Sequence, residues 1–134
     1  MSYDIYLKEP IGGEVVQLPI KHVMPGGTYL AEYDAKTGIF SAKPNSEAWL
    51  NITYNYSKYY YEAEPDKGIR VIYGMTGLES IPVLEEMIAI ITKFHPDKTI
   101  NENYWQACAG NAIKPLYQLK AMAELRPDAI WDGD

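Results

Sequence analysis

The residues best placed to do chemistry in this sequence lie around Gly74, Thr76 and Gly77. An apolar segment that ends at Tyr73 leads into the two glycines, and a helix is predicted to begin just after them. Free backbone amides and the helix dipole at such a start favour an anion, and Arg70 places a positive charge nearby. The lysine of a phosphate loop and the third glycine of a dinucleotide fingerprint are absent. The alternative, which we favour, is a tight turn that needs glycine for its backbone conformation.

A second candidate site lies on residues 49–61, which are predicted to form a strand. Polar and apolar side chains alternate there, so that Asn51, Thr53 and Asn55 share one face. Such a face can hold a polar ligand or a protein, although an ordinary solvated sheet has the same pattern. Three consecutive tyrosines cannot all point inward, which favours a contact surface. The candidate contact residues here are Trp49, Asn51, Asn55, Tyr59, Tyr60 and Tyr61.

Other residues that carry chemistry are too scattered to assemble a site locally. His22 and His95 stand alone, which disfavours a zinc site or a nucleophile–base pair. Cys108 lies between two alanines and is interpreted as a core residue. We therefore predict no metal, no cofactor and no catalytic residues, and an enzyme is the least favoured class of function.

Charge and hydropathy restrict the partners. The 134 residues carry a net charge of −6, and Arg70 and Arg126 are the only arginines. Nucleic-acid binding is not expected, because a phosphate backbone needs clustered basic residues. The first residues lack the features of a signal peptide, and the longest apolar stretch, residues 81–91, is too short for a membrane span. We expect a cytoplasmic protein that does not enter a membrane.

The first half of the chain has the pattern of antiparallel strands. Residues 3–8 alternate in polarity, and a turn at Gly12 and Gly13 leads into a return strand over residues 14–18, which predicts a hairpin. After a break at residues 25–27, strands are predicted over residues 28–33 and 39–40, on either side of a turn. The strand over residues 49–61 and another over residues 69–73 follow.

The second half has helical periodicity. The predicted packing face of its first helix consists of Val83, Met87, Ile90, Ile91 and Phe94. Two starts compete, because Thr76 and Glu79 form a capping box, whereas a cap at Ser80 would place Pro82 in the first turn. We favour a loose turn from Thr76 and a regular helix from Ser80.

The remaining residues predict two shorter elements and a packed tail. A helix is predicted over residues 102–109, and after it Asn111 caps a final helix that ends before Pro127. Trp131 is predicted to pack against the body of the protein. The fold class is α+β: an N-terminal antiparallel β-sheet packed on one face by two or three C-terminal helices, in a single domain over residues 1–134.

Residues 49–56, 68–70, 73–77, 79–84 and 126–134 carry a resemblance to a known group of proteins. They resemble a family of short uncharacterised proteins encoded in phages and prophages, over most of the chain except residues 31–46. The resemblance implies an accessory protein in the cytoplasm of an infected bacterium, where such proteins often inhibit a host defence or modulate a host enzyme. It implies no catalytic residue.

We rank three functions on this basis. The first is a non-enzymatic phage-type accessory protein that binds a host or phage protein, as an inhibitor, through the aromatic face and the acidic surface. The second is a binder of a small anionic or nucleotide-like ligand at Arg70, Gly74, Thr76 and Gly77, with a stacking tyrosine or tryptophan. The third is an enzyme. The aromatic face could alternatively be the interface of a homodimer.

Overall fold

The computed structural model describes residues 1–22, 31–42 and 45–134 and has an α+β fold, as predicted. The described strands are β1 (Ser2–Lys8), β2 (Gln17–His22), β3 (Ala31–Asp34), β4 (Ile39–Ala42), β5 (Asn45–Glu47), β6 (Trp49–Thr53) and β7 (Ile130–Gly133). The helices are α1 (Ser57–Ala63), α2 (Gly77–Phe94) and α3 (Ala109–Leu125), and the 3-10 turns are η1 (Tyr54–Tyr56) and η2 (Gly68–Ile72).

The central sheet is antiparallel, with its three strands in the order β6-β1-β7. In β1, Tyr3, Ile5 and Leu7 are buried and the residues between them are half-buried, as their alternation predicts. Leu50 of β6 lies opposite Ile5, and Trp131 of β7 lies opposite Leu7. Trp131 is 1% exposed, so the prediction of a packed tail is confirmed.

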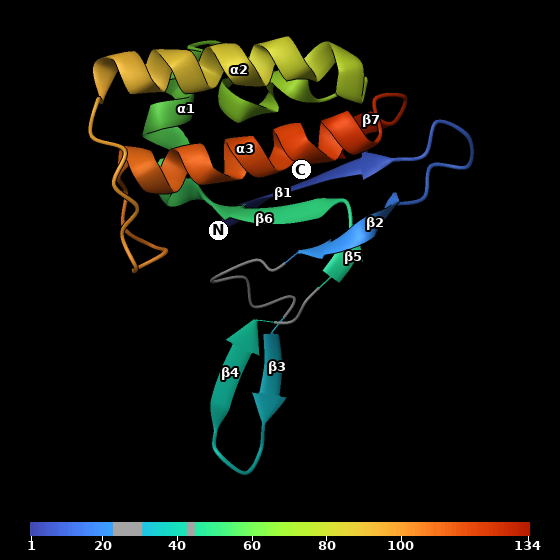
Figure 1. The fold of residues 1–134 in the computed structure, drawn as a ribbon, viewed down its shortest axis with the longest axis vertical. Helices are drawn as coiled ribbons and strands as arrows, with labels where there is room; N and C mark the ends of the chain where they lie inside the picture. The colour runs from blue at the N-terminus through green and yellow to red at the C-terminus, as the bar shows by residue number, and fades with distance from the viewer. Residues whose placement is uncertain (23–30, 43–44) are drawn as a thin grey trace.

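The helices gather on one side of this sheet (Figure 1). α3 contacts β6, and α2 packs along α3 on the side away from the strands (Figure 1). The buried core includes Ile52 of β6 and Leu116 and Leu119 of α3. The predicted packing of a sheet on one face by helices is therefore confirmed.

Two smaller strand pairs lie outside the central sheet (Figure 1). β2 pairs with β5 and β3 pairs with β4, and the second pair confirms the turn predicted before residue 39. The hairpin predicted around Gly12 and Gly13 is short. Lys8 forms a bridge with Val15, the Glu9 N–H donates to the Glu14 carbonyl at 2.7 Å, and the Val16 N–H donates to the Leu7 carbonyl at 2.9 Å. The predictions for residues 25–30 lie outside the described residues.

The strand predicted over residues 49–61 is wrong beyond Thr53. Leu50 and Ile52 are buried as predicted. The Thr53 hydroxyl then accepts a hydrogen bond from the Asn55 N–H at 3.2 Å, which starts η1, and α1 follows directly. Tyrosine and threonine favour strands on average, but this local cap turns the chain into a helix.

The strand predicted over residues 69–73 is also wrong, because these residues lie in η2. Ile69 and Ile72 are both buried. Residues three apart share a face in a 3-10 turn, whereas a strand would direct them to opposite faces. The core position of both isoleucines therefore selects the turn.

Helix α2 begins at the start that we did not favour. The Thr76 hydroxyl accepts the Glu79 N–H at 3.1 Å, and the Glu79 carboxylate accepts the Thr76 N–H at 3.0 Å. This capping box places Pro82 inside the helix. The buried residues of α2 are Gly77, Ser80, Leu84, Met87, Ile88 and Ile91. The predicted packing face is thus rotated, and Phe94 is 60% exposed.

The helix predicted over residues 102–109 is absent. Residues 95–108, which we call the connecting loop, have no regular secondary structure. Asp97 and Asn101 each accept a side-chain hydrogen bond from the N–H two residues on, and so does Asn103. Such local turns compete with helix formation, which explains the loop.

Candidate functional site

The amides of the predicted anion site at residues 74–77 already have partners. The Gly77 N–H donates to the Ala129 carbonyl at 2.8 Å, and the Leu78 N–H donates to the Pro127 carbonyl at 2.9 Å. The amides of residues 74–76 also donate to groups of the protein. The start of α2 therefore binds the segment after α3 and offers none of these amides to an anion.

Backbone geometry accounts for both glycines of this turn. Gly74 has a φ of +86°, which side chains disfavour. A Cβ on Gly77 would lie 2.6 Å from the Arg126 carbonyl oxygen, so only glycine allows α2 to approach the end of α3. The tight-turn interpretation thus explains Gly74 and Gly77 without a ligand.

Arg70, the predicted positive charge of that site, is engaged within the protein. Its Nε donates to the Asp134 backbone carbonyl at 2.8 Å, and its Nη2 donates to the Tyr54 hydroxyl at 3.2 Å. The guanidinium also lies over the Tyr3 ring, 4.8 Å from its centroid. A planar cation stacked on aromatic rings stabilises the packing of the sheet face.

Three of the four aromatic residues that were predicted to form an exposed contact face are buried instead. Trp49, Tyr59 and Tyr60 are 8%, 8% and 0% exposed. The Tyr60 hydroxyl donates to the Ala112 carbonyl at 2.9 Å and so joins α1 to α3. Helix α1 directs Tyr59 and Tyr60 into the core and leaves Tyr61 at the surface.

The two asparagines of that predicted face form contacts within the protein. The Asn51 amide donates to Ser2 and Asp4, at 2.6 and 2.8 Å, on the sheet face away from the helices. The Asn55 amide donates to the Trp105 carbonyl at 2.8 Å. Asn55 therefore ties the connecting loop to η1, next to the cavity described below.

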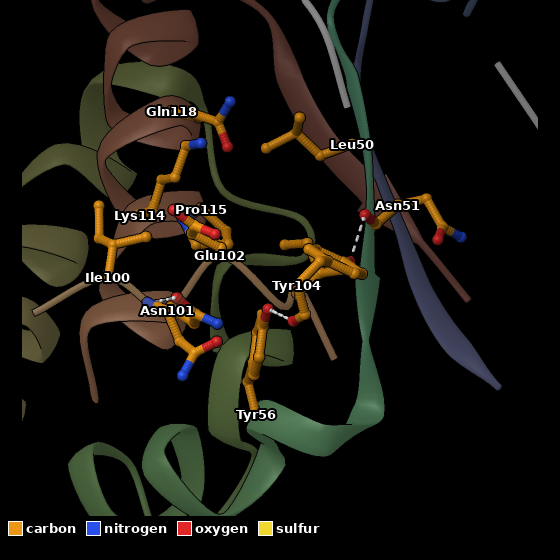
Figure 2. Close-up of a pocket in the computed structure, with 12 residues that line it drawn as sticks. Leu50, Asn51, Tyr56, Ile100, Asn101, Glu102, Tyr104, Lys114, Pro115 and Gln118 are labelled. Carbon is orange, nitrogen blue, oxygen red and sulfur yellow. Dashed lines mark hydrogen bonds between the residues drawn. The ribbon is translucent and has the colours of Figure 1, made fainter. Parts of the chain in front are cut away.

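A cavity of about 190 Å³ lies between β6, α3 and the connecting loop (Figure 2). It is lined by Leu50, Asn51, Ile52, Tyr56, Ile100, Asn101, Glu102, Tyr104, Asn111, Lys114, Pro115 and Gln118. Asn51 contributes its backbone, and its side chain points away from the cavity (Figure 2). We call this the β6–α3 cavity.

Tyr104 forms the wall of the cavity next to the edge of β6 that faces away from β1. Its hydroxyl donates to the Asn51 carbonyl at 3.2 Å and accepts the Thr53 N–H at 2.9 Å, so that one side chain occupies the position of a neighbouring strand. Burial raises the pKa of the Tyr104 phenol. The phenol therefore stays protonated and can donate its hydrogen bond to the Asn51 carbonyl. The Tyr56 hydroxyl donates to the Tyr104 carbonyl (Figure 2).

Asn111 holds the other side of the connecting loop. It was predicted to cap α3, but α3 begins at Ala109 and Asn111 is buried inside its first turns. Its amide donates to the Asn103 and Gln106 carbonyls at 3.0 and 3.1 Å, and its oxygen accepts the Asn101 N–H at 2.9 Å. All the hydrogen-bonding groups of this side chain bind the loop, so the cavity wall has a fixed shape.

A second hollow of about 440 Å³ lies on the neighbouring surface of α3. It is lined by Lys98, Ile100, Gly110, Ile113, Lys114, Tyr117, Gln118 and Ala121. Ile100, Lys114 and Gln118 border both hollows. Large apolar side chains lie exposed here: Ile100 lines both hollows and is 57% exposed, and Tyr117 lines the second and is 50% exposed. Trp105 is also 50% exposed, and its ring lies 4.9 Å from the ring of Tyr104, which lines the β6–α3 cavity. We call Ile100, Trp105, Tyr117 and the two hollows the α3 face.

The charge of the α3 face differs from that of the whole chain. Lys98 and Lys114 line the second hollow, with no acidic residue among its described lining. Neither lysine forms an ion pair with any described residue. Glu102 is the one carboxylate that lines the β6–α3 cavity in the described residues. The described lining of the second hollow is thus positive and otherwise largely apolar, on a protein of net charge −6.

The β6–α3 cavity could not be predicted from the sequence, because two of the three elements that form it were assigned to other structures. The connecting loop was predicted as a helix, and β6 was extended past its end. Asn101 and Asn103, which recur at the spacing of successive local turns, are the signal that could have identified the loop.

No metal site is apparent in the part of the chain that the structure describes, where no three or more His, Cys, Asp or Glu side chains gather. The described helices include none that is both long and apolar enough to span a membrane. Comparison of the chain with protein-family models, with curated proteins and with solved structures finds no match.

Proposed function

We propose that this protein is a non-enzymatic binding module that holds a protein partner against its α3 face. The observation that supports the proposal is the exposure of Ile100 and Tyr117, which line two adjoining hollows, and of Trp105, whose ring packs against the cavity wall at Tyr104. Exposed apolar clusters bordered by polar groups are typical of interaction sites. Tryptophan and tyrosine are also the residues that most often dominate the energy of an interface.

The cellular setting of the proposal rests on the resemblance to phage and prophage proteins. It makes a bacterial host protein in the cytoplasm the proposed partner, and inhibition of that protein the proposed effect. The contact surface that we now propose differs from the one expected from sequence, because Tyr59 and Tyr60 lie in the core.

Native mass spectrometry of the protein purified from expressing bacteria tests the proposal. The double variant Trp105→Ser, Tyr117→Ser should lose a bound partner that the wild type retains, because each true aromatic anchor contributes about 2 kcal/mol or more. The matched control is Ile11→Ser, Leu78→Ser, which replaces residues that are 90% and 65% exposed outside both hollows.

Three results would contradict the proposal. They are the absence of any complex with the wild type, equal retention by both double variants, and loss of the complex by the control alone. Analytical ultracentrifugation identifies a second copy of this chain as the partner, since such a dimer would dissociate in the first variant and persist in the control.

A further inference from the structure

We infer that the β6–α3 cavity takes a single aromatic side chain of the partner, and that carboxylates beside that side chain contact Lys98 and Lys114. This inference rests on the proposed function and names the chemistry of the segment that the α3 face recognises. It is argued from the size of the cavity, the fixed position of its walls and the charge around it.

The volume of the β6–α3 cavity fits a single aromatic ring. A dry protein cavity of about 150 Å³ lined by apolar side chains binds benzene, and this cavity measures about 190 Å³. Drug-sized ligands occupy pockets of about 300–1,000 Å³, so the cavity by itself is smaller than the pockets that such ligands fill. Leu50, Ile52 and Pro115 supply apolar walls, and Tyr56 and Tyr104 supply aromatic ones.

The walls are fixed before any partner arrives. The Tyr104 hydroxyl binds two backbone groups of β6, and the Asn111 side chain makes three hydrogen bonds to the connecting loop. A Cβ on Gly110 would lie 2.2 Å from the Thr99 carbonyl oxygen, so the loop crosses α3 in direct contact. Pre-organised walls reduce the entropy that binding costs.

The charge around the cavity favours acidic residues on either side of the bound aromatic residue. Lys98 and Lys114 are exposed and have no ion-pair partner among the described residues. At physiological salt the Debye length is about 8 Å, so a bound segment in the second hollow is affected mainly by the charges that line it, which are the two lysines. Glu102 borders only the cavity, where the uncharged ring is bound, and the second hollow has lysines without an acidic residue among its described lining. An aromatic residue flanked by acidic ones complements this arrangement.

NMR titration of the ¹⁵N-labelled full chain tests the inference with the blocked peptide acetyl-Glu-Glu-Phe-Glu-Glu-amide. Shifts should appear at residues 50–53, 100–104 and 114–118. The matched peptides replace the central Phe by Ala, or all four Glu by Lys, and each should bind at least tenfold more weakly. The net charge of −6 favours the Lys peptide over the surface as a whole. A preference for the Glu peptide would therefore show that Lys98 and Lys114 determine binding.

The variant Lys114→Glu changes an exposed side chain and should keep the fold. This variant should bind the Glu peptide at least tenfold more weakly than the wild type, and it should bind the Lys peptide more tightly. The inference is overturned by the absence of shifts at millimolar peptide, by equal binding of the Ala peptide, or by shifts elsewhere. If the peptides fail while Trp105→Ser, Tyr117→Ser still loses its partner, the proposed function stands without this anchor chemistry. If both tests fail, the α3 face is not an interface.

Discussion

Single side chains determine the shape of the candidate site. Tyr104 is the clearest case, because its hydroxyl binds two backbone groups on the edge of β6 that faces away from β1. An unpaired edge strand is open to pairing with other chains. A phenol that occupies part of this edge both protects β6 and positions the connecting loop.

Replacement of Tyr104 by Phe should destabilise the protein by about 1–3 kcal/mol, because the Thr53 N–H would be left buried without a partner. Urea unfolding measures the loss. The control is Tyr61→Phe, which removes a hydroxyl that has no hydrogen-bond partner among the described residues and should cost less than about 0.5 kcal/mol. Equal losses in the two variants would show that the Tyr104 hydroxyl is not a structural bridge.

Residue types alone do not reveal such bridges. The sequence identifies Asn111 as a polar residue near the start of a helix, and a helix cap is the usual role of asparagine there. Its actual partners are the backbone groups of Asn101, Asn103 and Gln106. These become neighbours of the Asn111 side chain only when the connecting loop folds back over α3, which no local pattern encodes.

At the scale of elements, the predictions succeeded where one periodicity dominates. β1 alternates without interruption, and its buried face is the predicted one. The strand predicted over residues 49–61 failed beyond Thr53, and the strand predicted over residues 69–73 failed entirely, because tyrosine and isoleucine favour strands on average. A hydroxyl cap at Thr53 and the spacing of Ile69 and Ile72 select helical turns instead.

Gly110 lies where α3 contacts the connecting loop, and there the usual effect of helix propensity should be reversed. Gly→Ala within a helix normally stabilises a protein by about 0.5–1 kcal/mol. At Gly110 a Cβ would meet the Thr99 and Lys98 carbonyl oxygens at 2.2 and 2.6 Å. Gly110→Ala should therefore destabilise the protein by about 1–3 kcal/mol and displace the loop.

Hydrogen exchange across residues 98–106, together with urea unfolding, measures both effects. The control is Ala121→Gly, at an exposed position of the same helix. It should cost about 1 kcal/mol from helix propensity alone and leave exchange in the loop unchanged. A stabilising Gly110→Ala substitution would contradict the direct contact between the loop and α3.

At the scale of the whole molecule, ion pairs join segments that are distant in the chain. Arg126 ends α3 and binds the Glu9 carboxylate from the segment after β1, as well as Asp128 at 3.0 Å. Hydrogen bonds from Arg126 lower the pKa of Glu9 and of Asp128 below their ordinary values of 4.5 and 3.8. The folded protein thus holds these groups ionised at a pH where the unfolded chain takes up protons.

This difference sets the sign of the pH dependence. A lowered pKa in the folded state contributes stability above the ordinary pKa, and that contribution is lost as the pH falls through 4.5 and 3.8 toward the folded values. Arg126→Gln should make the urea midpoint fall less steeply between pH 5 and pH 2. Lys36→Gln removes a charge that has no ion-pair partner among the described residues and should leave that slope unchanged. Parallel profiles would exclude the Arg126 contribution.

The C-terminal tail completes the sheet and fixes the start of α2 at the same time. β7 pairs with β1, and the Trp131 backbone also exchanges hydrogen bonds with Gly74 and Met75, both at 2.9 Å. The Trp131 indole donates to the Ser80 hydroxyl at 2.7 Å. A packed tail was predictable from the apolar area of a terminal tryptophan, but its pairing with β1 was not, because the two strands lie at opposite ends of the chain.

Trp131→Ala should therefore destabilise the protein by about 3–5 kcal/mol. Since whole domains are stable by only about 5–15 kcal/mol, the melting temperature should fall sharply, and deletion of residues 128–134 should lower it further. The control is Trp105→Ala, which truncates the same side chain where it is 50% exposed and should cost much less. If Trp131→Ala and Trp105→Ala melt alike, the tail does not hold α2 to the sheet, and the packing of Trp131 would then contribute no more to stability than a surface contact.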